Sequence, residues 1–433
     1  MDDTDSAEGM CTTFLCYNLV KSIIWHESEN TSLLDYPNLI RLNPNIPWKT
    51  RGNAALSIRL KTDIGPSEIF RICKNFILKY ATSPKANSGL VILTGDSVPE
   101  EIQDFSRRAL WSVLGLQETR KLISKFNIDF FGLRSQQGLV GALAGIGNLL
   151  ADDHTYELIA YKQDPELPRK IEHSKIVEMS LRTFPNTFNS YDKDYDRVMI
   201  MPHGPDPVLC GIRGETARDV KNAFDMLQPM ENLGGWMIFR TNQGTGVHLN
   251  ATIDILDPKV YQSGKLVACV ASKPRAEIGG HVFFNVASKS NEILCACYEP
   301  TGDFRRHAME LIPGDIVEVG GGIRKPTTLH PKVLNLEYFK PIMLAKKTRL
   351  VNPRCPSCRG SMTSRGRYQG FKCSKCNLIS KNISKFELED ARKVLHKLYL
   401  PPTKAHRHLT KPIHRFSIKK KYHPTRLIEG WIN

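Results

Sequence analysis

The sequence predicts a multidomain α+β protein with four parts: a mixed α/β part, a ferredoxin-like α+β layer, an OB-fold β-barrel and a C-terminal four-cysteine ribbon. Three observations predict this organisation. A chain of 433 residues is too long for one ordinary domain. The period of its hydrophobic pattern changes twice along the chain. Two Cys-x-x-Cys pairs lie close together near the C-terminus.

The composition is that of a globular protein, with 41% hydrophobic and 24% charged residues. The longest apolar run, residues 139–150, is too short to span a bilayer, so no membrane partner is predicted. The chain opens on acidic residues, which is not the pattern of a signal peptide. Four of the eleven cysteines cluster and the others lie singly, which favours a reducing, cytoplasmic location.

The first 135 residues mix strand-like and helical patterns. Residues 56–61 alternate with period two, whereas residues 68–80 and 100–123 have the pattern of amphipathic helices. A glycine-rich run follows at residues 137–148. It lacks the order of glycines found in nucleotide-binding loops, so we expect a helix whose small residues allow close packing.

The segment from residue 156 to about 250 changes to strands with intervening helices. This alternation predicts a small α+β layer, which we interpret as ferredoxin-like. Strands are expected at residues 157–161, 197–202, 210–214 and 236–240, and a helix at 216–227.

Residues 260–340 consist almost entirely of short strands. Three strands, a helix at 304–311 and two more strands follow one another in the order of an OB barrel. Such barrels bind single-stranded nucleic acids or oligosaccharides, although a purely structural barrel remains an alternative. The strands are expected at residues 265–272, 280–286, 293–299, 314–324 and 333–339.

The positive charge is concentrated after the barrel. Residues 341–433 hold 22 Lys or Arg against four Asp or Glu, within a formal net charge of +16 for the chain. This excess, with aromatic residues interleaved, favours a polyphosphate partner over a merely solvated surface. We expect residues 411–421 to form a basic arm that becomes ordered on RNA.

The strongest local signal is a predicted structural zinc site. Each Cys-x-x-Cys pair offers two thiolates from one tight turn, and two such turns complete a tetrahedron. The ligands are Cys355, Cys358, Cys373 and Cys376, with fourteen residues between the two pairs. A redox role for one pair is disfavoured, because the second pair lies at ligand spacing.

The chain opens with three carboxylates within four residues: Asp2, Asp3 and Asp5. Their mutual repulsion requires an offsetting charge, for which Mg²⁺ with a polyphosphate is a usual partner. Thr12 and Thr13 precede an apolar helix expected over residues 14–25, and phosphates bind well at helix N-termini. The alternative is a disordered acidic start followed by a capped helix.

Residues 41–53 form a third polar cluster, pinned by two prolines and a tryptophan. Its side chains suit phosphate or base contacts, and a solvated connection is the alternative. The candidate residues are Arg41, Asn43, Lys49, Arg51 and Asn53.

These clusters, in this order ahead of the barrel and ribbon patterns, resemble the archaeal tRNA agmatidine synthetases, the 2-agmatinylcytidine synthetases of the minor isoleucine tRNA. The resemblance spans nearly the whole chain. Its specific parts are Asp2-Asp-Thr-Asp-Ser6 with Gly9-Met-Cys-Thr-Thr13, residues 41–53, Pro202-His-Gly-Pro205, Gly211-Ile-Arg-Gly214 and Thr241-Asn-Gln-Gly-Thr245.

The resemblance implies an ATP-dependent ligase that joins agmatine to carbon 2 of the wobble cytidine in the CAU-anticodon isoleucine tRNA. The codon AUA is then read as isoleucine. Because the cytosine 2-oxygen is a poor leaving group, phosphorylation by ATP with Mg²⁺ would activate it. The implied domains are an ATP-dependent kinase-like catalytic domain (1–135), a ferredoxin-like agmatine-binding domain (136–255), an OB-fold tRNA-binding domain (256–342) and a zinc ribbon with a basic tail (343–433).

The resemblance also implies residue roles. Asp2, Asp3 and Asp5 would hold Mg²⁺ and phosphate, Thr13 would become autophosphorylated, and the five candidates of residues 41–53 would bind ATP. A guanidinium prefers carboxylate partners. The candidates for binding agmatine are His203, Asp206, Arg213 and Glu215. In the ribbon, the expected tRNA contacts are Arg359, Arg365, Arg367, Lys372 and Lys375. No protein partner is inferred.

Two departures from the family pattern are apparent. In the family a short apolar strand ends just before the first aspartate pair, and here Met1 occupies its last position. We therefore expect either an upstream start codon or a chain without that strand. Gly246 stands where an acidic residue is expected, which weakens an agmatine role for that turn.

Two other classes of protein compete with the synthetase. A non-catalytic single-strand binder would explain the barrel and the ribbon but not the acidic-threonine opening. An aminoacyl-tRNA synthetase is unsupported, since the sequence contains no recognisable class signature.

Overall fold

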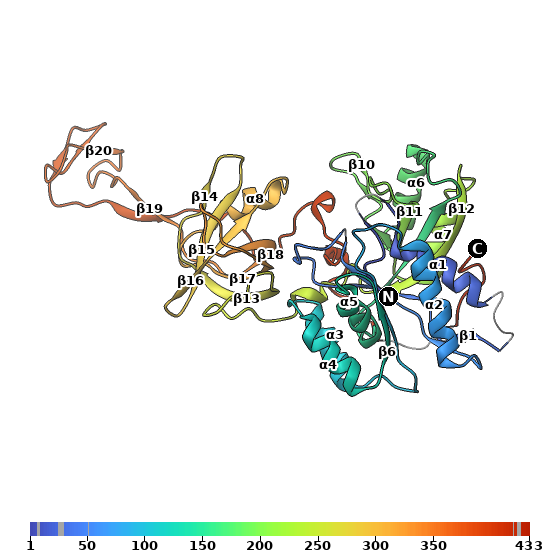
Figure 1. The fold of residues 1–433 in the computed structure, drawn as a ribbon. Helices are drawn as coiled ribbons and strands as arrows, with labels where there is room; N and C mark the ends of the chain where they lie inside the picture. The colour runs from blue at the N-terminus through green and yellow to red at the C-terminus, as the bar shows by residue number, and fades with distance from the viewer. Residues whose placement is uncertain (7–8, 25–29, 51, 419, 422–425) are drawn as a thin grey trace.

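The computed structural model describes residues 1–6, 9–24, 30–50, 52–418, 420–421 and 426–433. Figure 1 shows three parts: a large α/β body that contains both termini, a β-barrel beside it, and a small ribbon that projects beyond the barrel. Within the described residues, no helix has the length and apolar character needed to cross a membrane.

A six-stranded sheet runs through the body in the order β3-β2-β12-β7-β11-β8. The parallel pairing of β2 with β12 aligns Asn38 with Arg240 and Leu39 with Thr241. Residues before and after position 135 therefore share one sheet. The strands are β2 (Asn38–Arg41), β3 (Ala54–Ser57), β7 (Thr155–Lys162), β8 (Thr187–Phe188), β11 (Val208–Gly214) and β12 (Leu233–Thr241).

A buried ion pair lies beside the pairing of β2 with β12. Arg240 on β12 donates through Nε to Asp35 Oδ2 at 2.9 Å, and its other nitrogens donate to the carbonyls of Leu149 and Leu150 at 3.1 Å each. The side chains of Arg240 and Asp35 are 2% and 3% exposed. Because both charges are hydrogen-bonded, their desolvation is largely offset, and loss of either would leave the other uncompensated.

The first two residues extend the sheet toward a second hairpin, β5 (Gly89–Ile92) paired with β6 (Asp129–Gly132). Met1 exchanges two 2.9 Å backbone hydrogen bonds with Leu56 on β3, one of them from its ammonium group. Asp2 exchanges two 3.0 Å bonds with Gly89 on β5. Residues 1–2 therefore occupy a strand position between β3 and β5.

Successive side chains along each strand point to opposite faces of the sheet, and each face has its own hydrophobic core. Ile159 and Tyr161 on β7 pack under α1 and α2, whereas Leu158 and Ala160 pack under α6 and α7. A third cluster joins β2, β3 and β5 to α3, α4 and α5. The helices are α1 (Thr12–Ser22), α2 (Pro66–Tyr80), α3 (Glu100–Ala109), α4 (Leu116–Lys125), α5 (Gly138–Gly147), α6 (His173–Thr183) and α7 (Ala217–Asp225).

Three predicted elements differ from the structure. The helix expected over residues 100–123 is two helices, because backbone carbonyls at the break are used elsewhere: Trp111 accepts from Ser263 N at 2.8 Å. The strand expected over 56–61 is interrupted at Arg59, whose guanidinium turns inward to the Asn148 carbonyl at 3.1 Å. Of residues 197–202, only the first two form a strand. The short pairs are β1 (Ser32–Leu33) with β4 (Leu60–Lys61) and β9 (Tyr191–Asp192) with β10 (Arg197–Val198).

The barrel has the strand order predicted from the sequence. Five strands close in the order β13-β17-β18-β16-β15, with β15 also pairing back to β13 and with β16 parallel to β18. The elements are β13 (Ser263–Val270), β14 (Arg275–Ala276), β15 (Val282–Ser288), β16 (Asn291–Cys297), α8 (Asp303–Ala308), β17 (Ile316–Arg324) and β18 (Val333–Met343). A 3₁₀ turn, η2 (Val247–Leu249), connects the body to it.

An exposed two-stranded stalk, β19 (Thr348–Val351) with β23 (Phe386–Glu389), carries the ribbon away from the barrel (Figure 1). The ribbon consists of β20 (Met362–Ser364), β21 (Phe371–Cys373) and β22 (Ile379–Ser380). Its small core consists mainly of two of the cysteines with Met362 and Phe371. So small a core suits a domain that depends on a metal.

The C-terminal segment corrects a prediction. Residues 411–418 pack on the body, since Arg415 is fully buried and paired with Asp153 and Glu215. Arg415 also donates to the Gly244 carbonyl. The described part of this segment therefore belongs to the packing of the body and is not a free arm. Two 3₁₀ turns, η3 (Thr403–Ala405) and η4 (Ile413–Arg415), lie along it, and the last residues hydrogen-bond to β12.

We predict that Arg415→Ala destabilises the body by about 3 kcal/mol, because Asp153 and Glu215 lose a fully buried partner and keep one lysine each, and the Gly244 carbonyl loses its donor. Thermal unfolding monitored by fluorescence measures the effect. Arg107→Ala is the control, because that arginine is half exposed and should change the midpoint little. Equal midpoints for the two variants would contradict a structural role for the buried tail.

Candidate active site

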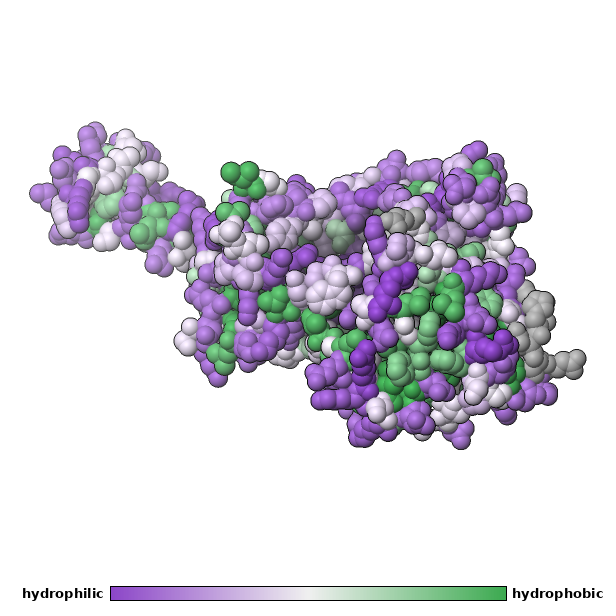
Figure 2. Space-filling model, in the orientation of Figure 1, coloured by the Kyte–Doolittle hydropathy of each residue, from purple (hydrophilic) through white to green (hydrophobic). Residues whose placement is uncertain are grey.

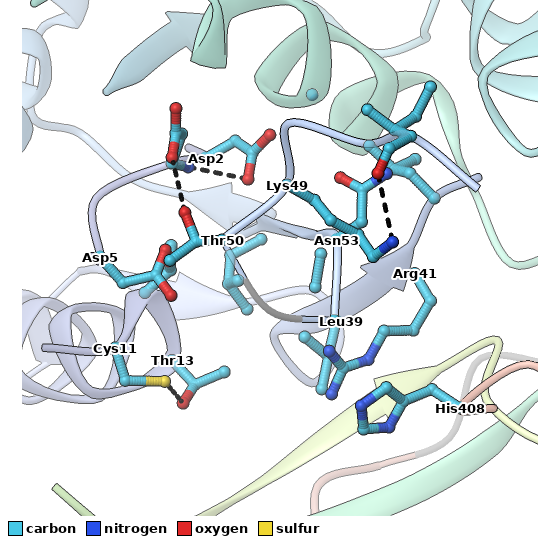
Figure 3. Close-up of a pocket in the computed structure, with 18 of the residues that line it drawn as sticks. Asp2, Asp5, Cys11, Thr13, Leu39, Arg41, Lys49, Thr50, Asn53 and His408 are labelled. Atoms are coloured by element: carbon cyan, nitrogen blue, oxygen red, sulfur yellow. Dashed lines mark hydrogen bonds between the residues drawn. The ribbon is translucent and has the colours of Figure 1, made fainter. Parts of the chain in front are cut away.

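A cavity of about 330 Å³ opens in the body next to the first residues of the chain. It is lined from both halves of the shared sheet and from the C-terminal segment (Figure 3). Nine predicted site residues line it: Asp2, Asp3, Asp5, Thr13, Arg41, Lys49, Asn53, Asp206 and Arg213. Three others, Asn43, His203 and Glu215, do not line it, and Arg51 lies outside the described residues.

Asp2, Asp3 and Asp5 lie in one loop, the acidic loop, which lines the cavity. Asp3 has a φ of +53°, a left-handed conformation that aspartate tolerates better than most residues. Its backbone N–H donates to Asp2 Oδ1 at 2.8 Å. Burial, and then the charge of Asp3, raise the pKa of Asp2 to about 8. Among the described residues, neither Asp2 nor Asp3 has an ion-pair partner, and the Asp3 side chain hydrogen-bonds to Asn87 and Thr50.

Glycines of α5 make room for this loop. A Cβ on Gly141 would overlap the Asp2 carboxylate, and a Cβ on Gly138 would lie 2.8 Å from the Asp2 carbonyl. Gly145, one turn further along, is less crowded: a Cβ there would lie 3.2 Å from Ala55 Cβ and 3.6 Å from the Leu56 carbonyl oxygen. The sequence prediction of a closely packed helix is confirmed, and the closest neighbour of its glycines is the acidic loop.

Thr13 lies in the first turn of α1, where it is nearly buried but still lines the cavity. Its hydroxyl is 3.0 Å from the sulfur of Cys11, which is the residue before the helix. No side chain caps this helix end among the described residues. Burial raises the pKa of the Cys11 thiol, so the sulfur is uncharged at neutral pH.

The opposite wall is a network of two arginines, one carboxylate and one histidine. Glu157 on β7 accepts from Arg213 Nε at 3.1 Å and lies 4.0 Å from Arg41 Nη2. His408 Nδ1 accepts from Arg213 Nη2 at 2.9 Å. Burial, and then the two arginines, hold the pKa of His408 well below its usual range, so its ring is neutral. Two cations against one carboxylate leave this wall positive.

Residues 41–53 connect the cavity to the barrel. Asn43 donates to the Tyr261 carbonyl at 2.8 Å, and Asn45 donates to the Ser263 hydroxyl at 2.8 Å. Lys49 lines the cavity and donates to the carbonyl of Pro44 at 2.6 Å. Asn43 therefore acts in the described structure as a link to the barrel rather than as part of the cavity wall.

The predicted agmatine residues separate into two groups. Asp206 lines the cavity and accepts from Arg169 at 3.0 Å, and Arg213 belongs to the basic wall. Glu215 faces away from the cavity and pairs with Arg415 and Lys420 of the tail. His203 lies outside the cavity lining, 3.4 Å from Arg197.

Sequence reasoning missed Cys11, Glu157 and His408. Glu157 had a detectable signal, because it is a carboxylate within an otherwise apolar strand and shares a strand face with Ile159. His408 had none, since only the tertiary path of the tail brings it here.

The four cysteines of the ribbon form the predicted metal site. Their sulfurs all lie within 4.8 Å of one another. The backbone N–H groups of Cys376 and Lys375 donate to Cys373 Sγ at 3.4 and 3.3 Å, and these bonds lower the pKa of that thiol to about 6. Four convergent thiols, one of them readily ionised, suit zinc.

The cavity has carboxylates and a threonine on one side and a positively charged wall on the other, which suits a nucleotide and its metal. The barrel and the ribbon belong to classes of domain that bind nucleic acid. Together they define an enzyme of nucleic-acid modification.

Family models agree with this class. Residues 1–135 match the TiaS TCKD domain, residues 136–248 the TiaS FLD domain, and residues 352–394 the TiaS C-terminal zinc ribbon domain. The chain therefore belongs to the TiaS family.

Full-length relatives carry the same family name. The chain is 38% identical to the isoleucine-tRNA 2-agmatinylcytidine synthetase TiaS of Cenarchaeum symbiosum, over 96% of this chain and 92% of that protein. It is 35% identical to the Thermococcus sibiricus protein of the same name, over 95% and 94%. A crystal structure of TiaS in complex with its isoleucine tRNA and ATP is 34% identical with a TM-score of 0.84, covering 98% of each chain. A TiaS complex with the same tRNA, AMPCPP and agmatine is 32% identical with a TM-score of 0.80, again covering 98% of each chain.

We predict that Gly141→Ala lowers ATP-dependent activity by about a hundredfold, because its methyl group would displace the Asp2 carboxylate. The rate of ATP consumption with all substrates present measures the loss. Gly145→Ala, on the same helix but with a milder neighbour, is the matched control and should retain most activity. If both variants lose activity equally, the effect comes from the helix and not from Asp2.

Proposed function

We propose that this protein joins agmatine to carbon 2 of the wobble cytidine in the CAU-anticodon isoleucine tRNA, with consumption of ATP. The observation that carries this proposal is the match of 98% of the chain to the TiaS complex with its isoleucine tRNA and ATP. The cavity supports it, because it combines carboxylates, a threonine and a basic wall in one place. The modified base would pair with A, so that AUA is read as isoleucine.

The chemistry requires activation of the cytosine 2-oxygen. Oxygen is a poor leaving group, and its phosphorylation by ATP makes displacement by the amine of agmatine feasible. In this proposal the first 135 residues act as the kinase-like part, and Thr13 accepts a phosphoryl group from ATP. Thr13 suits this role, because its hydroxyl faces the cavity at the start of α1.

We propose that the acidic loop holds Mg²⁺ when ATP is bound. Asp2, Asp3 and Asp5 place hard oxygen ligands on one side of the cavity, and the raised pKa of Asp2 reflects the cost of its buried charge. A bound Mg²⁺ would offset that charge and neutralise the phosphates of ATP. Figure 3 shows the side chains of Asp2 and Asp5 on the lining of the cavity.

The basic wall is the proposed contact surface for ATP phosphates. Arg41 is the central residue, since its Nε is buried without a partner among the described residues. Burial lowers the pKa of Arg41 to about 10, against which the charge of Glu157 acts. The side chain is therefore still cationic at neutral pH. Lys49 and Asn53 line the cavity next to it.

For agmatine, the cavity offers carboxylates, which its guanidinium requires. Asp206 is the candidate that lines the cavity and belongs to the ferredoxin-like part. Glu215 is a weaker candidate, because its carboxylate is already bound by two cations of the tail. His203 is also weaker, since it lies outside the lining.

The barrel and the ribbon would hold the tRNA while the target base enters the cavity. The ribbon suits this task because it stands on an exposed stalk away from the body (Figure 1). Its basic residues Arg359, Arg365 and Arg367, with Lys372 and Lys375, would contact phosphates. We place the reaction in the cytoplasm, whose reducing conditions keep the four zinc-binding cysteines and the seven others out of disulfides.

Incubation of the protein with ATP, agmatine and a CAU-anticodon tRNA transcript tests the proposal. Nucleoside mass analysis should show the mass gain of agmatine condensation at the wobble cytidine. A transcript with cytidine at that position replaced by uridine is the control and should be unchanged. No gain with the cytidine transcript would refute the function. A chain that binds this tRNA without modifying it would instead match the single-strand binder.

Replacement of Cys373 by Ser should weaken tRNA binding about tenfold or more and lower the stability of the ribbon, because one zinc ligand and the small metal-dependent core are lost. It should spare phosphoryl transfer from ATP to Thr13, which occurs in a separate part. Filter binding and labelling from γ-labelled ATP measure the two effects. Cys269→Ser, at a cysteine outside the metal site, is the control. Equal loss of both activities in Cys373→Ser would contradict a separable ribbon.

A further inference from the structure

Tyr161 is a fully buried residue that the reaction described above does not use. It follows Glu157 and Ile159 on the same face of β7, and those two residues line the cavity. Its ring packs against two aromatic rings of α1, with centroid distances of 5.3 Å to Phe14 and 4.9 Å to Tyr17. These contacts fix the ring directly beneath the start of α1.

The ring contact with Phe14 places Tyr161 beside the first turn of α1, which carries Thr13, and a weak side-chain hydrogen bond with Thr13 acts against burial on the pKa of the Tyr161 hydroxyl. Yet among the described residues it has no partner at full hydrogen-bonding geometry. A buried hydroxyl without a well-placed partner costs folding free energy of about 1–3 kcal/mol. A buried hydroxyl of this kind is expected to gain a hydrogen-bond partner in another state of the protein or when a ligand binds.

The hydroxyl is a donor under all ordinary conditions. Burial raises the pKa of Tyr161 well above its usual value, so the phenol is protonated. It therefore cannot serve as a base for Thr13, and it can donate one hydrogen bond. The Cys11 thiol, 3.0 Å from the Thr13 hydroxyl, is a second uncharged group on the same side.

We propose that the Tyr161 hydroxyl donates a hydrogen bond to the phosphoryl group when Thr13 carries it. This inference rests on the proposed function, in which Thr13 is the acceptor. The unsatisfied donor of the free protein then gains an anionic acceptor, which is the stronger kind of hydrogen bond. The N-terminus of α1 carries a partial positive charge, which would also stabilise a phosphoryl group on Thr13.

Phosphoryl transfer from ATP to Thr13 exchanges one P–O bond for another. The bond between the γ-phosphorus of ATP and the oxygen bridging to the β-phosphate breaks, and ADP leaves with the electron pair. A bond forms between that phosphorus and Thr13 Oγ1. The hydroxyl proton passes to a carboxylate of the acidic loop, with Asp5 on the same side of the cavity as Thr13 (Figure 3). Tyr161 keeps its own proton and only donates a hydrogen bond.

Tyr161→Phe removes the hydroxyl and keeps the ring packing. The single-turnover rate of Thr13 labelling from γ-labelled ATP should fall about tenfold to a hundredfold, with the KM for ATP unchanged. Thermal stability of the unphosphorylated protein should be unchanged or higher, since an unsatisfied buried hydroxyl is lost. A labelling rate within twofold of the unmodified protein would overturn the proposal.

Tyr36→Phe is the matched control. Tyr36 is almost equally buried, but its hydroxyl already accepts from Ile428 N at 2.9 Å. Its removal should lower stability and leave the labelling rate of the folded protein unchanged. A slow rate in both variants would mean that loss of any buried tyrosine hydroxyl slows labelling, and would overturn a specific role for Tyr161.

A thermodynamic cycle covers the case in which Tyr161→Phe is itself destabilised. The gain in melting temperature on phosphorylation is measured in the unmodified and Tyr161→Phe proteins. A smaller gain in the variant supports the hydrogen bond, and equal gains overturn it. Thr13→Ala separates this inference from the proposed function. Undiminished labelling of Thr13→Ala would show that Thr13 is not the acceptor, independently of Tyr161.

Discussion

The parallel pairing of β2 with β12 is the interaction on which the rest of the structure depends. It joins the first 135 residues to the following layer in one sheet, and the buried Asp35–Arg240 pair is next to it. The cavity lies where these two halves meet: the acidic loop and Arg41 come from the first half, and Glu157 and Arg213 come from the second. If the pairing slipped by one residue, Leu39 and Ile40 would exchange faces and both cores would be lost.

The second constraint is space around the acidic loop. The chain passes between β3 and β5, where the neighbouring α5 must approach its backbone, and only glycine at positions 138 and 141 permits this. Carboxylates buried in this way are costly, as the raised pKa of Asp2 shows. That cost is acceptable where a cation binds, which connects the packing of α5 to the proposed use of Mg²⁺.

The C-terminal segment connects the distant parts of the molecule. It leaves the ribbon and barrel, passes residues 41–53 through Arg407, brings His408 to the cavity, and ends against β12. Its buried Arg415 explains why this basic stretch is part of the fold, although its composition resembles a disordered arm. Among the described residues the ribbon is joined to the rest by its stalk, and its surface is mostly hydrophilic with small hydrophobic patches (Figure 2). This position suits the proposed binding of tRNA.

The sequence by itself determined the features that depend on local spacing. These include the four zinc ligands, the strand order of the barrel, the helices from residue 68 and from residue 138, and the clustering of acids with Thr13. Tertiary structure decided what depends on distant segments. The helix over 100–123 breaks because its carbonyls bond to other parts. Glu157 reaches the cavity only through the shared sheet, and His408 only through the path of the tail. Periodicity reports which face of an element is apolar, but not which distant group will satisfy its polar atoms.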